Sequence, residues 1–253
     1  MPELPEVESA VRALRAATEG RVIVRARLFH PSLRARVAPA RLRTLVGARV
    51  ERVERRGKHQ LLHFEDGRAL HAHFRMAGDW HVDRADAVPP RYGRAVVELD
   101  DGGRVWLVDP RALSTLDIRD DVAALDLGLG PDALDAALRA RDLAPRLARR
   151  RGAIKPALLD QTLIAGVGNI YAAEALWLAR IDPRAAAATL TAGQITRMLV
   201  AIRSVLRRAL KGTIRFAVYD RAALPCRRCR TTIERIVQAG RSTYFCPRCQ
   251  TVA

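Results

Sequence analysis

Four cysteines confined to the last 28 residues constrain the fold of this 253-residue chain more than any other feature of its sequence. They form two Cys-x-x-Cys pairs, Cys226 with Cys229 and Cys246 with Cys249, and 16 residues (230–245) lie between the pairs. This spacing suits one tetrahedral Zn²⁺ ion held by two turns. Four thiolates leave no open position for a reacting water, so we predict a C-terminal hairpin folded around one structural zinc ion.

The charge of the chain predicts its partner. Lysine and arginine together number 44 against 27 aspartates and glutamates, which gives a formal net charge of +17. An excess of this size argues against an ordinary small-metabolite enzyme and favours a polyanionic partner. Several arginines near the cysteine pairs either contact such a partner or are solvated surface charges; they are Arg227, Arg228, Arg230, Arg241 and Arg248.

Hydrophobic periodicity divides the rest of the chain into two parts. A helix is predicted from Pro5 to about Gly20, and we expect the residues before Pro5 to form a mobile tip. From about Pro131 the spacing of apolar residues is again helical. Between these parts, short strand-like segments bounded by turn residues predict a β-sandwich or barrel; they span residues 22–28, 60–64, 69–74, 95–99 and 105–108.

The expected fold is therefore α+β and multidomain. We place an N-terminal helix with a β-sandwich in residues 1–125, a helical domain in 126–219 and the zinc finger in 220–253. The N-terminus has neither the basic nor the apolar region of a secretory signal. The most apolar segment, residues 158–179, is interrupted by polar residues and is not suited to spanning a membrane. We expect a cytoplasmic protein with no membrane partner.

A glycine-rich turn interrupts the helical part of the chain. Gly166 and Gly168 permit close approach to the backbone, and Asn169 is predicted to cap the helix that follows. The N–H groups and the positive dipole end at such a helix start suit a phosphate group. An ordinary helix–helix connection accounts for the same turn, so this motif alone leaves both interpretations open.

The N-terminal sequence Met1-Pro2-Glu3 offers an unusual nucleophile. Removal of Met1, which is efficient before a small residue, would give Pro2 a secondary amine at the chain end. Such an amine can attack C1′ of a sugar, and the iminium ion that results acts as an electron sink for elimination. The reference pKa of an α-amino group, about 8, is far below that of lysine, so more of it is nucleophilic at neutral pH. An ordinary Met-Pro start before a helix is the alternative interpretation.

Taken in order along the whole chain, several motifs resemble the formamidopyrimidine-DNA glycosylase/endonuclease VIII family. They are the start Met1–Glu8, Arg56-Gly57-Lys58, His73–Gly78, Asp109-Pro110-Arg111, the block Ile154–Tyr171 and the four-cysteine finger. The resemblance implies a β-sandwich, a helix-two-turns-helix domain and one zinc ion. It also implies a base-excision repair enzyme that acts as a monomer on damaged double-stranded DNA, in the bacterial cytoplasm at the nucleoid.

The resemblance also implies roles for individual residues. Pro2 is the Schiff-base nucleophile whose iminium ion drives β- and δ-elimination, and Glu3 is the general acid for base loss. Lys58 belongs to the same catalytic centre, where it grips a phosphate and offers a second amine. Met76 fills the gap that the extruded nucleotide leaves in the duplex. The other DNA-contacting positions are His73, Arg111, Lys155, Asn169, Tyr171 and Arg241.

Some positions depart from the purine-directed branch of that family. Ala112 and Leu113 stand where that branch has an arginine and an aromatic wedge, and Arg75 stands where the family usually has glycine. The connection from Lys211 to Cys226 is too short to include the long loop with which that branch covers 8-oxoguanine. We therefore expect oxidised pyrimidines, abasic sites or another bulky lesion to be preferred, although the sequence does not decide the base.

Two other functions remain compatible with parts of the sequence. A non-catalytic protein of the same fold that binds damaged DNA would share the charge and the finger, but it would not need Pro2 together with Glu3. A zinc-ribbon protein that binds RNA or the ribosome would share the charge and the cysteines. It would leave the N-terminus and the block around Asn169 unexplained.

Overall fold

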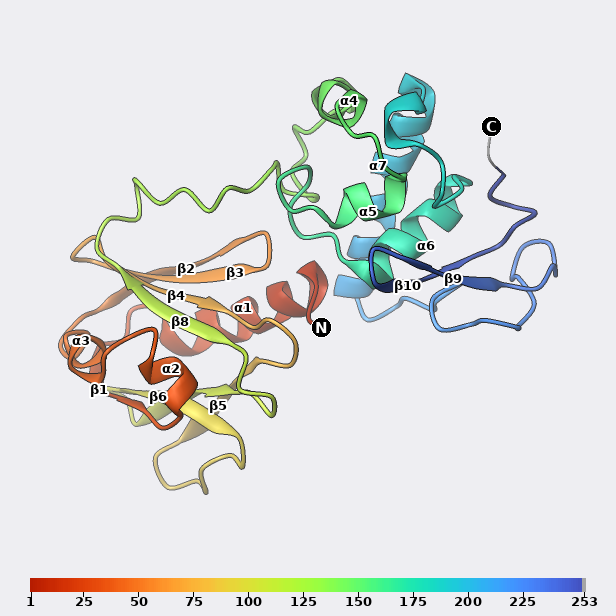
Figure 1. The fold of residues 1–253 in the computed structure, drawn as a ribbon. Helices are drawn as coiled ribbons and strands as arrows, with labels where there is room; N and C mark the ends of the chain where they lie inside the picture. Colours follow the sequence, from red (N-terminus) through yellow and green to blue (C-terminus); the bar gives the residue numbers. More distant parts are fainter. Residues whose placement is uncertain (252–253) are drawn as a thin grey trace. The chain divides into compact units, whose positions relative to one another are not determined.

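The computed structural model describes residues 1–251 (Figure 1). The chain divides into two compact units. Unit 1 contains Met1–Pro2 and Glu6–Leu127, and unit 2 contains Glu3–Pro5 together with the chain from Gly128 onward. Among the described residues, no helix combines the length and the apolar character that a membrane span requires.

Helix α1 (Leu4–Thr18) has the apolar face that its sequence predicts. Val7, Val11 and Leu14 are buried in the core of unit 1. Gly20 follows the helix with φ +78°, a left-handed conformation that glycine adopts without a steric penalty. The helix therefore ends where the sequence indicates.

Two four-stranded antiparallel sheets share the core of unit 1, which confirms the predicted β-sandwich. One sheet has the order β1 (Ile23–Leu28), β6 (Gly93–Leu99), β7 (Gly103–Val108), β5 (Asp79–Arg84). The other has the order β2 (Val50–Arg56), β3 (His59–Phe64), β4 (Ala69–His73), β8 (Thr115–Arg119). Two short helices, α2 (Pro31–Arg34) and α3 (Pro39–Arg43), follow β1.

Three strands, β2, β5 and β8, were not predicted from the sequence, and all three lie at sheet edges. The sequence of β5, DWHVDR, is mostly exposed and polar. Edge strands keep one side of the backbone unpaired and often carry charged residues that discourage aggregation. The burial patterns of β2 and β5 show little alternation, and that of β8 alternates over only five residues. Pairing with a central strand completes the definition of all three.

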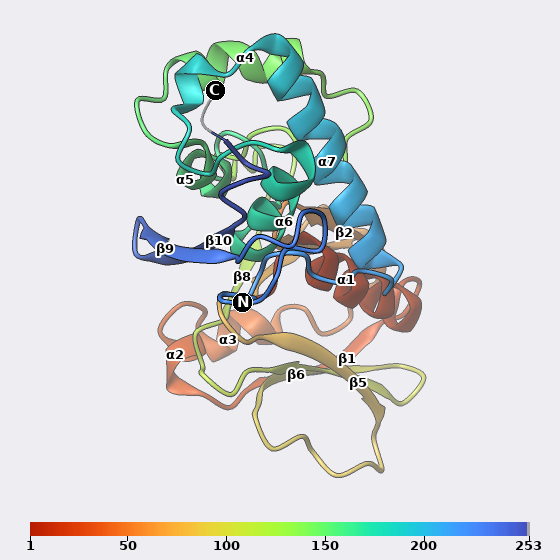
Figure 2. The ribbon, with the colours of Figure 1, turned by 90° about the vertical axis from the view of Figure 1, so that its right-hand side faces the viewer.

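Unit 2 is built around helix α6, which contacts three other elements of the unit (Figure 2). The helices of the unit are α4 (Ala140–Ala148), α5 (Ile154–Leu159), α6 (Asn169–Ala179) and α7 (Ala192–Leu210), with a short 3₁₀ turn at Ala187–Thr189. Helix α7 buries Ile195, Leu199, Ile202 and Leu206, which recur at the helical spacing expected in this part of the chain. Strands β9 (Glu234–Gln238) and β10 (Arg241–Phe245) form the C-terminal hairpin. Helix α6 contacts α5, α7 and β10.

Candidate functional site

The Glu3 carboxylate is bound to the start of α6. Its two oxygens accept the backbone N–H groups of Ile170 at 2.8 Å and Tyr171 at 3.3 Å, and Glu3 is 1% exposed. The N–H of Leu4 donates to the carbonyl of Gly166 at 3.1 Å. The expectation of a mobile tip before Pro5 is therefore wrong. The first turn of a helix has N–H groups without helical partners and a partial positive charge, and both attract a carboxylate.

The glycine turn before α6 is shaped to receive this N-terminal segment. A Cβ on Gly168 would collide with the carboxyl group of Glu3, and one on Gly166 would collide with the side chain of Leu4. Gly168, not Asn169, is the N-cap residue of α6, and no side chain caps the helix from that position. The prediction that Asn169 caps α6 is therefore wrong, because the Glu3 carboxylate accepts the N–H groups that a cap would accept.

Lys155 is a buried connection between α5, α6 and β10. Its ammonium donates to Asn169 Oδ1 at 2.6 Å, to Thr243 Oγ1 at 2.7 Å and to the carbonyl of Ser242 at 2.9 Å. Burial lowers the pKa of Lys155 to about 8, and the negative charge of Glu3 opposes this shift. An ammonium has three N–H donors, so the protein itself accounts for all of them. Asn169, which accepts one of these bonds, also donates its Nδ2 to the carbonyl of Ser242 at 3.1 Å.

The other predicted residues of unit 2 have different environments. Tyr171 is buried in the helical core, whereas Arg241 is exposed at the start of β10. Tyr219 was missed by the sequence analysis: burial raises the pKa of its hydroxyl, and the neighbouring side chain of Asn169 opposes this shift. A single tyrosine in a connecting segment carries no sequence signal, because its contact with Asn169 exists only in the folded chain.

Glu174 is a second buried carboxylate that sequence analysis missed. It accepts the backbone N–H groups of Ala217 at 2.8 Å, Val218 at 2.9 Å and Tyr219 at 2.8 Å. These bonds fix the segment that joins α7 to the finger. Its position as a single glutamate among the mostly apolar residues of α6 could have indicated a buried, hydrogen-bonded carboxylate.

In unit 1, three histidines lie together on β3 and β4. His59 is paired with His73 across the two strands, and their ring centroids are 4.6 Å apart. His59 Nδ1 lies 2.8 Å from His71 Nε2, and Arg119 Nη2 lies 3.5 Å from His71 Nδ1. Lys58 lies in the turn just before β3 and is largely buried.

These histidines are neutral at physiological pH. Burial, reinforced by neighbouring positive groups, lowers the pKa of His59 and of His71 to about 4 and that of His73 to about 3. The backbone N–H of Arg75 donates to His73 Nδ1 at 3.0 Å. A neutral imidazole carries one N–H, so Nε2 of His73 bears the proton. His73 can therefore donate a hydrogen bond to an anion without being charged.

A rigid loop follows β7 and presents Arg111 and Leu113 to solvent. The Asp109 carboxylate accepts the backbone N–H groups of Arg111, Leu113 and Ser114 at 2.7–2.9 Å. Burial alone would raise the pKa of Asp109, but these hydrogen bonds lower it. The Ser114 hydroxyl also lies 3.1 Å from the carbonyl of Phe74, at the start of the turn that carries the half-buried Met76. The loop and this turn are thus held together.

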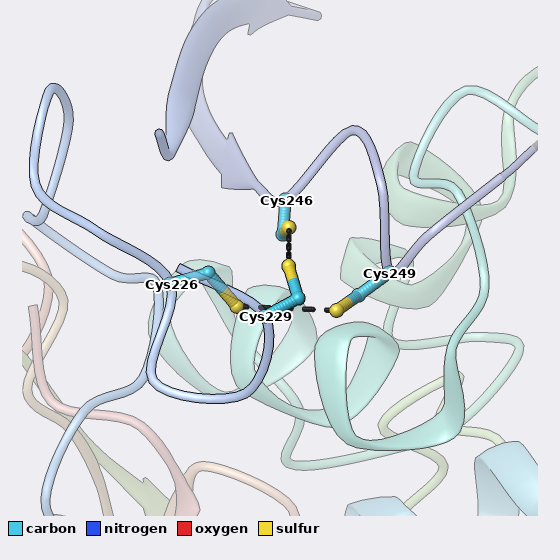
Figure 3. A group of neighbouring side chains, drawn as sticks. All are labelled: Cys226, Cys229, Cys246 and Cys249. Atoms are coloured by element: carbon cyan, nitrogen blue, oxygen red, sulfur yellow. Dashed lines mark hydrogen bonds between the residues drawn. The ribbon is translucent and has the colours of Figure 1, made fainter. Parts of the chain in front are cut away.

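The four cysteines converge as the sequence predicts (Figure 3). Their sulfur atoms all lie within 4.8 Å of one another, with 3.9 Å between Cys226 and Cys249 and 3.4 Å between Cys229 and Cys246. Tetrahedral zinc–thiolate sites have Zn–S distances of about 2.3 Å, which corresponds to S···S separations of about 3.8 Å. The sulfur positions therefore fit one zinc ion.

Comparison with known families covers nearly all of the chain. Residues 1–116 match the formamidopyrimidine-DNA glycosylase N-terminal domain, residues 129–218 match its H2TH domain, and residues 223–252 match the zinc finger found in FPG and IleRS. A protein named formamidopyrimidine-DNA glycosylase from Chloroflexus aurantiacus is 42% identical over 271 residues, which cover 99% of this chain and 98% of that protein. A protein of the same name from Paracoccus denitrificans is 39% identical over 282 residues, covering 99% and 100%.

Solved structures of formamidopyrimidine-DNA glycosylases also match this chain. The formamidopyrimidine-DNA glycosylase of Lactococcus lactis, non-covalently bound to DNA with an AP site, superposes with a TM-score of 0.91 at 30% identity and covers 98% of this chain and 99% of that chain. A complex of the Lactococcus lactis protein with DNA containing FAPY-dG has a TM-score of 0.90 at 30% identity, with the same coverage. These matches confirm the expected order of domains along the chain: a β-sandwich domain, a helix-two-turns-helix domain and a zinc finger.

Proposed function

This chain belongs to the formamidopyrimidine-DNA glycosylase family of base-excision repair enzymes, and we propose that it removes damaged bases from double-stranded DNA and then cleaves the strand. Strand cleavage would proceed at the abasic site through a Schiff base on Pro2. The observation that carries the proposal is the fixed, buried position of the Glu3 carboxylate on α6. A protein that only binds DNA has no need of such a group beside an N-terminal amine.

The reaction begins with the Pro2 amine, once Met1 has been removed. Its lone pair forms a bond to C1′ while the damaged base departs with the electrons of the glycosidic bond. Glu3 supplies the proton for base departure or for opening of the sugar ring. The Pro2 nitrogen then loses its proton and the C1′–O4′ bond of the sugar breaks, which leaves the iminium ion. This ion accepts the electrons released when C2′ loses a proton, and the C3′–O bond breaks. A second elimination at the 5′ side completes strand cleavage.

The DNA would be held mainly by its phosphates. Lys58 and Arg241 supply positive charge, whereas His73 supplies a neutral N–H donor whose tautomer is fixed by the backbone of Arg75. Asn169 supplies an amide whose orientation is set by Lys155. Phosphate contacts of this kind position the duplex without reading its sequence. The exposed Arg111 would add a further positive charge for the DNA, and Met76 would occupy the gap left by the extruded nucleotide.

The metal centre has a structural role in this proposal. The residues Cys226, Cys229, Cys246 and Cys249 would hold one zinc ion, which when bound closes the finger. The finger carries Arg241, and its strand β10 supplies the Ser242 carbonyl that receives Lys155 and Asn169. The protein would act as a monomer in the bacterial cytoplasm.

The class of damaged base is inferred from two features of the purine-directed branch that this sequence lacks. No long loop is available between Lys211 and Cys226 to cover an extruded base, and Ala112 brings no charge to the opposite strand. Leu113 is an exposed apolar wedge. We propose a permissive enzyme that accepts bulky lesions, including oxidised pyrimidines and ring-opened purines, with weak preference for the opposite base.

Borohydride trapping on DNA with an abasic site tests this proposal. Reduction of an iminium ion links the protein covalently to the DNA, so we expect a stable adduct with the fully processed enzyme. Pro2→Gly keeps an α-amine but loses the rigid secondary amine, and it should bind DNA normally while trapping poorly. Tight binding without any adduct from a preparation lacking Met1 would support a DNA-binding protein without lyase activity.

A further inference from the structure

The indole of Trp177 lies directly against one of the four cysteines. Trp177 is in the last turns of α6, and its Nε1–H donates to Cys226 Sγ at 3.4 Å. The backbone N–H of Arg228 donates to the same sulfur at 3.4 Å. Cys226 is fully buried, so both N–H groups reach its sulfur in surroundings shielded from water.

The position of the indole is fixed by further contacts. The Arg228 guanidinium lies 4.2 Å from the centroid of the Trp177 ring, within the range of a cation–π interaction. Arg228 Nη1 also donates to the Trp177 carbonyl at 3.4 Å. The ring packs against a small buried cluster that joins α6 to the finger, which consists of Ala173, Val218, Cys226, Ile233 and Cys246.

In the metal-loaded finger Cys226 is a thiolate, because metal binding requires a deprotonated sulfur. A hydrogen bond to a charged acceptor is stronger than one between neutral groups. Groups that hydrogen-bond to metal ligands orient them and typically change metal affinity or activity by 10- to 100-fold when removed. We propose that Trp177 is a positioning residue of the metal centre, which donates its indole N–H to the Cys226 thiolate and thereby ties metal retention to α6.

This link has a consequence for the other end of the helix. The first turn of α6 holds Glu3, and Asn169 in the same turn bonds to the Ser242 carbonyl of the finger. The finger is thus fastened to α6 at both ends of the helix, by Trp177 and by Asn169. The inference requires the metal centre but does not depend on the chemistry proposed for Pro2.

The sharpest test is made on the unmodified full-length protein loaded with ¹¹³Cd²⁺. A hydrogen bond to a cadmium-bound thiolate transmits a scalar coupling from the metal to the donor proton. We expect coupling between ¹¹³Cd and the Trp177 indole proton. Trp80 and Trp106 should show none, because their Nε1–H groups donate to Gln60 and Asp83. Cysteine Hβ coupling to the metal verifies loading, and its presence without any Trp177 coupling would overturn the proposal.

Zinc release provides an independent measurement. Trp177→Phe keeps an aromatic ring and removes the N–H donor, so zinc transfer to a chromogenic chelator should be roughly 10-fold faster than from the unmodified protein. Trp80→Phe is the matched control, since it also deletes an indole hydrogen bond, and it should release zinc at the original rate. Equal rates for the two variants would contradict the proposal. If Trp177→Phe fails to fold, the cadmium coupling alone decides.

Discussion

Glu3 links the fold of unit 2 to the proposed chemistry. Its carboxylate stabilises the start of α6, and in the proposed mechanism it also gives a proton to the departing base. These roles have different requirements. The helix needs hydrogen-bond acceptors, whereas base departure needs an ionisable group.

Glu3→Gln separates the two roles. The amide keeps one oxygen acceptor for the helix but has no proton to give, so excision of an intact damaged base should fall by about 10²–10⁴-fold. Cleavage of a preformed abasic site should survive in part, because no base has to leave. Single-turnover assays on the two substrates measure both quantities. Equal loss on both substrates would show that Glu3 does not act specifically on base departure.

Gly168 tests whether the position of Glu3 matters. Gly168→Ala places a methyl group against the Glu3 carboxyl, so base excision should fall while the protein loses about 1–3 kcal/mol of stability. Gly193→Ala in α7 is the matched control, because a Cβ there meets nothing closer than 3.8 Å. Alanine in a helix should leave activity unchanged and should not lower stability. Normal excision by Gly168→Ala would show that the turn does not need to hold Glu3 in this position.

At the scale of secondary-structure elements, α6 joins residues that are far apart in sequence. The bonds from its first turn to Glu3 span 167 and 168 residues, and that from Trp177 to Cys226 spans 49. Helical periodicity could predict the helix but not these hydrogen-bond partners. A local sequence pattern contains no information on which distant residue will accept the N–H groups of the first turn. The same limit explains the missed edge strands β2, β5 and β8.

The roles of Lys155 and Arg241 can be distinguished by the salt dependence of DNA binding. Arg241 is exposed and should contact a phosphate directly, so Arg241→Ala should lower the slope of log affinity against log salt by roughly one contact. Lys155→Met removes three buried hydrogen bonds and should weaken binding with little change in slope. A reduced slope for Lys155→Met would mean that Lys155 itself reaches a phosphate.

The histidines on β3 and β4 make the stability of unit 1 depend on pH. His59 and His71 have pKa values of about 4 in the folded protein, against 6.5 for the ordinary side chain. The unfolded chain therefore binds more protons between these values, and stability falls as pH decreases from about 6.5 towards 4. Each of these histidines should lower the free energy of unfolding by roughly 1–2 kcal/mol when the pH falls from 7.5 to 5.

Urea unfolding of unit 1 at pH 7.5 and 5 measures this effect. His71→Leu should flatten the dependence, because it removes one buried imidazole and a positive neighbour of His59 in the protonated state. Because His73 stays neutral in this range, DNA binding through its N–H group should not become stronger as the pH falls from 8 to 5. An unchanged pH dependence of stability in His71→Leu would refute the assignment of neutral, buried imidazoles.

Across the molecule, the net charge of +17 predicted a polyanionic partner and the cysteine spacing predicted a zinc finger, whereas DNA as the partner came from the family resemblance. The cysteine cluster was predictable because metal ligation imposes fixed short spacings. The burial of Lys155 and Tyr171 could not be predicted from the sequence. In a basic protein, the residues around a lysine or a tyrosine do not show whether it lies on the surface or in the core. The binding of Glu3 to α6 was also missed, because it joins the two ends of a long stretch of chain.

If the amine of Pro2 performs strand cleavage, then cleavage requires an N-terminus from which Met1 has been removed. A homogeneous preparation that retains Met1, verified by mass spectrometry, has an amide nitrogen at Pro2 and therefore no available lone pair. We expect it to bind abasic DNA normally, to leave the strand intact and to form no borohydride adduct, whereas the processed enzyme cleaves and is trapped through its N-terminal peptide. Strand cleavage by the Met1-retaining protein would contradict the mechanism and would make Lys58 the next amine to test.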